Sequence, residues 1–241
     1  MVPDAANAVS SALMTNDLEA RRVAAAERTG GVSSGSVYEA AWRQIAPRAK
    51  GDVLDFGAGT GSLAMRLLTE SAVTSVTAAD LAAHATVSPP DSSSANKLRW
   101  LTADLNAPLP LPPASFDLIV AIEIIEHLEN PRATAREWRR LLRPGGALVM
   151  STPNTESIRS LLSFAARGQH ASFTARSYPE HVTPLARIDV QRLLAEAGFT
   201  DVQFTWSNFG LLPALSVSWQ ALSAGLLGGL RFSDNMVAVA R

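Results

Sequence analysis

The sequence predicts an α/β protein built on one doubly wound, mainly parallel sheet. Three observations support this class. From residue 37 onward, short apolar segments of strand length alternate with segments of helical periodicity. The first apolar segment, "DVLDF", runs directly into a glycine-rich turn and a helix, which is how a strand-helix unit opens. The length of 241 residues is enough to bury the core of one such domain.

The first 36 residues differ in composition from the rest of the chain, because they are rich in Ala, Ser and Gly. One helix is predicted over residues 16–28, and "TGGVSSGS" (29–36) after it is typical of a flexible hinge. We therefore expect residues 1–36 to form an arm or lid and residues 37–241 to form the main domain.

The main domain opens with a helix over 37–46, because Val37, Ala41 and Ile45 fall on one helical face. Residues 52–68 then predict a strand, a glycine turn and a second helix. Further short apolar strands are predicted at 74–80, 98–104, 116–122 and 146–152. Between the second and third strands, "SPPDSSSAN" (88–96) favours a loop or a single helical turn.

The later helices carry start and stop signals. Asn130 and Pro131 are typical of an N-cap and a first helical position, and that helix is expected to stop at Pro144. Residues 186–199 predict another helix, ended by Gly198. The final strands are predicted over 200–206 and 235–241, and no internal repeat is visible.

Composition excludes several classes of function. With 21 basic and 22 acidic residues, the chain has no excess positive charge for a nucleic-acid backbone, so a small-molecule partner is expected and no nucleic acid. With no cysteine it has no disulfide, thiolate zinc site or cysteine nucleophile, and any metal must use oxygen and imidazole ligands. The N-terminus lacks a basic segment followed by an apolar core, which favours a cytoplasmic protein.

The glycine-rich turn "DFGAGTG" is the strongest local signal. Gly57, Gly59 and Gly61 allow a sharp turn and a close approach to a ligand. Asp80 ends the next strand, where a carboxylate can accept hydrogen bonds from both hydroxyls of a ribose. The alternative is a tight turn between strand and helix that binds nothing.

Asp55, immediately before these glycines, would repel the pyrophosphate of a dinucleotide, but it suits a ligand that carries an ammonium and a sulfonium. Residues 55–61 resemble the first motif of the class I S-adenosylmethionine-dependent methyltransferases, and the resemblance extends over about residues 37–241. It implies a Rossmann-like, seven-stranded sheet with an antiparallel last strand. It also implies a role for each matching residue: Asp55, Gly57, Gly59 and Gly61 at the methionine moiety, Asp80 at the ribose, and Leu81, Asp104 and Leu105 at the adenine.

The segment "EIIEHLENP" places three ionisable groups directly after an apolar strand. If the chain forms one helical turn there, Glu123, Glu126 and His127 share a face at the carboxyl edge of the sheet. Two carboxylates and an imidazole suit Mg²⁺ or Mn²⁺. The alternative is that the glutamates lie at a helix N-terminus and His127 packs, or acts as a general base without metal.

Together, "EIIEHLENP", "STPN" and "EHVTP" resemble a branch of the family that includes ubiquinone-pathway O-methyltransferases and bacterial natural-product and glycan methyltransferases. Ubiquinone-pathway relatives carry a Glu-x-x-Glu-His metal site at this point. His181, in "EHVTP", is a candidate fourth ligand or catalytic base, or it caps a helix that starts near Pro184. His84 and His170 are expected at the surface.

No residue from 202 to 230 is charged, and the stretch is long enough to suggest a membrane span. If the strands on either side pair in one sheet, however, both ends of the stretch emerge on the same side, so we expect no stable membrane insertion. Three alternatives remain for about 208–231: a buried insert, a surface for a homodimer, or a shallow membrane-contacting element. Pro213 and several glycines favour a broken helix.

The predicted function is transfer of the methyl group of S-adenosylmethionine to an oxygen of a small metabolite in a biosynthetic reaction. His127 and His181 are the candidate catalytic bases, and Glu123, Glu126 and His127 are the candidate ligands of Mg²⁺ or Mn²⁺. Two alternatives are an RNA 2′-O-methyltransferase and a non-catalytic module that binds S-adenosylmethionine. Neutral overall charge disfavours the first of these.

Overall fold

The computed structural model describes residues 35–81, 92–213 and 215–241. Most of the expected arm or lid, the helix predicted over 16–28 and His84 therefore lie outside the described residues. Gly35 and Ser36, which the sequence placed in a hinge, are instead the first residues of helix α2.

One seven-stranded sheet organises the chain, in the spatial order β3-β2-β1-β4-β5-β7-β6. All neighbouring strands pair in parallel except at β7, which is antiparallel to both of its neighbours. The predicted seven-stranded sheet with an antiparallel last strand is confirmed. The strands are β1 (Gly51–Phe56), β2 (Val73–Asp80), β3 (Leu98–Thr102), β4 (Phe116–Ile122), β5 (Leu142–Pro153), β6 (Gln203–Trp206) and β7 (Asn235–Ala240).

Strand pairing gathers the candidate site at one edge of the sheet. Because β1 to β5 are parallel, their carboxyl ends meet at the same edge. Ile122, the last residue of β4, pairs with Ser151 of β5. Antiparallel β7 begins at that edge, since Asn235 pairs with Pro153.

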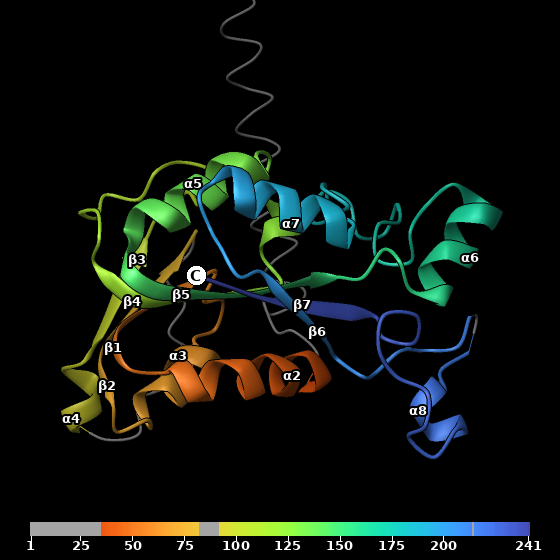
Figure 1. The fold of residues 1–241 in the computed structure, drawn as a ribbon, viewed down its shortest axis with the longest axis horizontal. Helices are drawn as coiled ribbons and strands as arrows, with labels where there is room; N and C mark the ends of the chain where they lie inside the picture. The colour runs from red at the N-terminus through yellow and green to blue at the C-terminus, as the bar shows by residue number, and fades with distance from the viewer. Residues whose placement is uncertain (1–34, 82–91, 214) are drawn as a thin grey trace, which may run out of the picture.

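Helices cover both faces of the sheet. In Figure 1, α2 and α3 lie on one face and α5 and α7 lie on the other, while α6 and α8 lie at the same end of the molecule, on opposite sides of the sheet. Each covered face encloses its own apolar core. The α-helices are α2 (Gly35–Ile45), α3 (Ser62–Leu68), α4 (Ser92–Ala95), α5 (Pro131–Leu141), α6 (Ile158–Arg167), α7 (Arg187–Glu196) and α8 (Trp219–Leu222), and the 3₁₀ turns are η1 (Ala46–Arg48) and η2 (Ile125–His127).

The signals that predicted the helices have visible structural causes. The Asn130 side chain accepts a hydrogen bond from the Ala133 N–H at the start of α5. Gly198 follows α7 with φ +90°, the left-handed conformation that glycine adopts without strain. The single turn α4 confirms the prediction for residues 92–95.

Strand β5 and helix α6 differ most from the sequence prediction. Strand β5 begins at Leu142 and not at residue 146, because Leu142 already pairs with Phe116 before the register shifts. Helix α6 was not predicted. The Ser157 side chain caps it by accepting from the Ser160 N–H, and Gly168 ends it with φ +67°.

The charge-free stretch, from about 208 to 230, forms a broken segment whose described residues are mostly half-buried or exposed. It contains the single turn α8 and a short bridge between Leu211 and Ser218. Several of its large apolar side chains are exposed, so the alternative of a buried insert does not fit. Among the described residues, no helix combines the length and the apolar character needed to cross a membrane.

Candidate active site

The glycine turn after β1 is fastened to the end of β2. The N–H groups of Gly57 and Ala58 both donate to the Ala79 carbonyl, at 2.9 and 3.1 Å. The Gly59 N–H donates to Asp80 Oδ2 at 2.8 Å. These amides are therefore directed at β2 and not at a ligand phosphate, which is consistent with a cationic ligand at this turn.

Two of the glycines are required by close contacts. Gly57 has φ +85°, and a Cβ there would lie 2.7 Å from Cγ1 of Ile124. Gly61 also has φ +85°, and its Cβ would lie 2.7 Å from the Trp100 ring. The Gly57 contact places the glycine turn directly against the segment that carries Glu126 and His127.

Asp55 is a buried carboxylate with an unused oxygen. It is 2% exposed, and its Oδ2 has no hydrogen-bond partner among the described residues. Burial, assisted by the charge of Asp80, raises the pKa of Asp55 to about 7. A buried acceptor of this kind is stabilised by a cationic group such as an ammonium.

Tyr38 on α2 is a neighbour that the sequence did not reveal. Burial, together with the charge of Asp55, raises the pKa of its hydroxyl above the ordinary value. Helix α2 therefore brings a phenol to the glycine-turn end of β1. The helical pattern around residue 38 indicated a core-facing helix but gave no sign of this contact.

The residues predicted at the ribose and adenine occupy the same sheet edge. Asp80 ends β2 half-buried, with Leu81 directly after it. Asp104 is exposed, and its Oδ1 accepts from the backbone N–H and side-chain amide of Asn106. Leu105 is buried in the core beneath. Their roles in cofactor binding stay predictions.

A carboxylate and two imidazoles meet beyond the end of β4. Glu126, in η2, is fully buried, and its Oε2 accepts from Thr152 Oγ1 at 3.1 Å. Its Oε1 has no hydrogen-bond partner among the described residues and lies 4.0 Å from Nε2 of His127. Ligand atoms of Glu126, His127 and His181 all lie within 4.8 Å of one another.

His181 is held in place by its own loop. The N–H groups of Val182 and Thr183 both donate to the Glu126 carbonyl, at 2.9 and 3.0 Å. The His181 Nδ1 donates to the Ser172 carbonyl at 2.8 Å, because a carbonyl can only accept. Its ring meets that of His127 edge to face, with centroids 4.8 Å apart. His181 does not cap α7, which begins only at Arg187.

The protonation state of His181 follows from this arrangement. Burial lowers the pKa of His181 below the ordinary value, so the neutral ring is favoured. With the proton on Nδ1, Nε2 is left as the atom that can accept a proton or bind a metal.

Glu123 is not part of this three-residue cluster, contrary to the sequence prediction. Its φ of +52° turns the chain before η2 begins. Its Oε1 accepts from Ser151 Oγ at 2.7 Å, and its Oε2 accepts from Asn235 Nδ2 at 2.6 Å. Burial raises the pKa of Glu123 to about 7. The pKa of Glu126 is raised well above its ordinary range, by burial and also by the charge of Glu123.

The sequence pointed to one of the two hydrogen-bond partners of Glu123 but not to the other. Ser151 lies in "STPN", which was quoted for the family resemblance, but nothing in the sequence pointed to Asn235. His170, expected in a surface loop, is half-buried, with Nδ1 2.9 Å from Ser160 Oγ and its ring stacked on Phe164.

Comparison with known families decides the assignment. The sequence profile of a methyltransferase domain family matches residues 36–204. The chain belongs to this family. Relatives of the chain include proteins named as O- and C-methyltransferases.

Two curated relatives of the methyltransferase differ in the atom that they methylate. A malonyl-[acyl-carrier protein] O-methyltransferase of Paenibacillus sp. is 32% identical, over 62% of this chain and 55% of that protein. The chain thus spans about half of the length of that relative. A ubiquinone/menaquinone biosynthesis C-methyltransferase of Paracoccus denitrificans is 30% identical, over 73% of this chain and 76% of that protein.

Solved structures share the fold of the methyltransferase. An S-adenosylmethionine-dependent methyltransferase from Mesorhizobium loti aligns with a TM-score of 0.59 and 21% identity, over 86% of this chain and 98% of that one. A Burkholderia thailandensis 1,6-didemethyltoxoflavin-N1-methyltransferase with bound S-adenosylhomocysteine aligns with a TM-score of 0.58 and 18% identity. The alignment covers 100% of this chain and 92% of that one.

Proposed function

We propose that the methyltransferase methylates a hydroxyl oxygen of a small-molecule acceptor, and that Glu126, His127 and His181 form the site that takes the hydroxyl proton. The observation that carries this proposal is the buried, unpartnered Oε1 of Glu126 beside His127. Because Ile124 packs against Gly57, this cluster adjoins the glycine turn.

The residues of the glycine turn fit S-adenosylmethionine. When bound, this cofactor supplies a methyl group on a positively charged sulfonium. Asp55 offers its unused Oδ2 to the cationic methionine end, which stabilises the ionised form of the carboxyl group. Asp80 offers carboxylate oxygens to the ribose hydroxyls, while the Gly59 N–H fixes its orientation.

The histidines supply a proton acceptor near neutral pH. His181 keeps its Nε2 available because its Nδ1 proton is held by Ser172. Glu126 lies beside His127, and a positive charge that develops on that ring favours the ionised form of Glu126 against the burial that raises its pKa. Removal of the hydroxyl proton makes the acceptor oxygen a stronger nucleophile.

The same three residues fit a divalent metal ion. Their ligand atoms lie within 4.8 Å of one another, and the unpartnered buried oxygen of Glu126 is of the kind that a cation satisfies. One carboxylate with two imidazoles suits Mn²⁺ better than Mg²⁺. When bound, the ion would supply Lewis acidity that lowers the pKa of a hydroxyl. Glu126, His127 and His181 would hold it, with Glu123 outside the ligand set.

The proposal is tested by product analysis. The purified chain is incubated with S-adenosylmethionine carrying a ¹³C methyl group and a panel of phenols, hydroxy acids and carboxylic acids. We expect the label on oxygen, as identified by NMR of the isolated product, and at least about a hundredfold slower transfer by Glu126→Gln.

A parallel reaction with RNA oligonucleotides separates the alternatives. Label on the carbon or nitrogen of a small acceptor would contradict the O-methylation proposal. Label on a ribose 2′-oxygen, with none on the small molecules, would replace it with RNA methylation.

A further inference from the structure

Exposed apolar side chains are concentrated at one end of the methyltransferase. We call residues 158–167 and 208–231 the apolar end. Of the ten large hydrophobic residues that are exposed among the described residues, eight belong to it, so the patch is not scattered surface. These eight are Leu161, Leu162, Phe164, Phe209, Leu215, Val217, Leu222 and Leu226.

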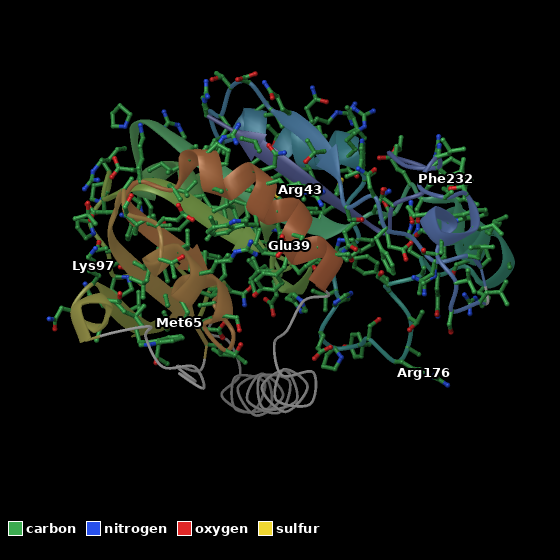
Figure 2. All side chains as sticks on the ribbon, turned by 90° about the horizontal axis from the view of Figure 1, so that it is seen from below. Glu39, Arg43, Met65, Lys97, Arg176 and Phe232 are labelled. Atoms are coloured by element: carbon green, nitrogen blue, oxygen red, sulfur yellow. The ribbon has the colours of Figure 1, made fainter. Side chains whose placement is uncertain are left out.

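The two segments of the apolar end lie at the same end of the molecule and touch where α6 begins. Figure 1 places α6 and α8 at the same end of the long axis, and Figure 2 shows Phe232, next to the second segment, at that end as well. The Ile158 N–H donates to the Arg231 carbonyl at 2.9 Å, and Arg231 Nη1 donates to the Glu156 carbonyl at 2.8 Å. The segments are therefore joined directly.

The most exposed side chains project from the α8 region. Leu222 is 67% exposed and Leu226 is 88% exposed. Exposing two leucines to this extent is unfavourable in water unless another apolar phase or partner covers them.

The charges around the apolar end are mostly positive: Glu156 and Asp234 adjoin it, but Asp234 is paired with Arg159, and other arginines are left over. Residues 202–230 contain no charged side chain, and residues 157–179 contain three arginines and no acidic residue. Arg167 and Arg231 are both exposed. Arg167 donates a hydrogen bond to Ser163 Oγ, and Arg231 donates one to the Glu156 carbonyl. Neither arginine forms an ion pair with a described residue, whereas Arg159 pairs with Asp234.

This charge pattern distinguishes two possible occupants. In a symmetric dimer built on the apolar end, the same surface would meet itself, so its surplus of positive charge would be doubled at the interface. An anionic lipid surface instead offers negative headgroups to the arginines and an apolar interior to the leucines.

We propose that the apolar end docks on the surface of an anionic lipid bilayer. Leu222 and Leu226 enter the boundary between headgroups and acyl chains, and Arg167 contacts the phosphates. The contact is shallow and reversible, and it requires no spanning helix. It does not depend on the acceptor or on the metal, so its test is independent of the proposed chemistry.

The test is flotation of the full-length protein with vesicles. We expect binding to vesicles of phosphatidylglycerol and phosphatidylcholine in equal parts, weakening with added salt, and much weaker binding to phosphatidylcholine alone. Leu222→Ser combined with Leu226→Ser should weaken binding to the anionic vesicles by about tenfold or more. Leu162→Ser with Phe164→Ser should act in the same direction from α6.

Matched controls separate docking from general effects. Ile188→Ser removes an equally large exposed side chain from α7, and Arg43→Gln removes a charge from α2, away from the apolar end in Figure 2. Both should bind vesicles as the unaltered protein does, whereas Arg167→Gln should lower affinity for anionic vesicles alone. Circular dichroism verifies folding of each variant.

Two results would overturn the proposal. One is absence of binding to anionic vesicles at low salt. The other is a dimer in sedimentation velocity that is lost in the Leu222→Ser, Leu226→Ser variant, with vesicle binding unchanged, since the apolar end would then be an interface between two copies of the chain.

Discussion

Asn235 donates from its side-chain amide to Glu123 Oε2 over 2.6 Å, although the two residues are 112 positions apart in the chain. Antiparallel β7 makes this bond by starting at the edge where β4 ends. Asn235→Ala leaves a half-buried carboxylate with one partner fewer, so it should lower the free energy of unfolding by about 1 to 2 kcal/mol. Urea denaturation measures the loss.

A surface amide provides the control for this prediction. Asn106 is exposed, although its Oδ1 accepts from the Glu129 N–H. Asn106→Ala should cost less than about 1 kcal/mol, because water replaces the lost partner. If Asn235→Ala and Asn106→Ala lowered the free energy of unfolding equally, the hydrogen bond from Asn235 to Glu123 would stabilise the fold no more than an exposed one.

Asp80 is expected to dominate cofactor affinity. Asp80→Ala should remove the proposed charge-assisted hydrogen bonds to the ribose, and it also removes the acceptor of the Gly59 N–H in the glycine turn. Affinity for S-adenosylmethionine should fall by about 1.5 to 3 kcal/mol in isothermal titration calorimetry. Unchanged affinity in a folded variant would remove Asp80 from the binding site.

Cofactor binding should depend on pH through Asp55. Because its pKa is about 7 in the unliganded protein, the carboxyl group is protonated below that pH. A cationic ligand requires the ionised form, so affinity should fall by up to about tenfold per pH unit as the pH decreases below 7. Asp55→Asn should bind more weakly and lose this dependence. Calorimetry in buffers of different ionisation enthalpy should detect proton release by the unaltered protein near pH 7.

The same shift sets how Asp55 affects stability. The carboxyl group ionises at 3.8 ordinarily but at about 7 in the fold, so the unfolded chain loses its proton first as the pH rises. The contribution of Asp55 to stability is therefore greatest below 3.8, decreases between 3.8 and about 7, and is constant above. Asp55→Asn should gain stability relative to the unaltered protein on going from about pH 5 to about pH 8. A constant difference would show that Asp55 has an ordinary pKa.

Gly57 should tolerate no side chain unless its neighbour gives way. Gly57→Ala combines φ +85° with a Cβ 2.7 Å from Ile124, so it should destabilise the fold by about 1 to 3 kcal/mol and displace the segment that carries Glu126. Adding Ile124→Gly removes both Cγ1 and Cβ, which lie 2.7 and 2.9 Å from the added Cβ, and should restore part of the activity in a double-mutant cycle. Strictly additive effects would show that the contact is not the cause.

The cluster beyond β4 should distinguish a metal ligand from a base. If a metal ion is bound, excess chelator should abolish activity and Mn²⁺ should restore it. His127→Ala should raise the metal concentration needed for half-maximal rate if His127 is a ligand, but should lower the rate at every metal concentration if it is a base. The rate profile against metal concentration is the measurement.

The activity measured in excess chelator also tests whether the cluster binds a metal ion at all. Activity that persists undiminished in excess chelator would leave Glu126, His127 and His181 as a proton-accepting site without metal. Affinity for S-adenosylmethionine, measured in the same variants, should change little in either case, which separates this cluster from the glycine turn.

The sequence alone determined the elements and their type. Hydrophobic periodicity, the Asn130 cap and Gly198 are signals carried by contiguous residues, so β4 and α5 were predicted nearly to their observed bounds. The glycine turn, with Asp55 before it and Asp80 after it, likewise lies within one strand-helix-strand unit. Local backbone preferences are sufficient for such features because they depend on near neighbours.

Only the tertiary structure decided which residues meet in the cluster. Glu123 and His127 are close in sequence, yet a positive φ and the bonds to Ser151 and Asn235 draw Glu123 aside, while the backbone of the 181–183 loop docks on Glu126 and brings in His181. Strand order and the docking of the loop determine the distances between these side chains, and neither can be predicted from the local periodicity of the sequence. The apolar end follows the same rule, because composition gives a stretch its hydrophobicity but only packing determines whether that surface is buried or left in water.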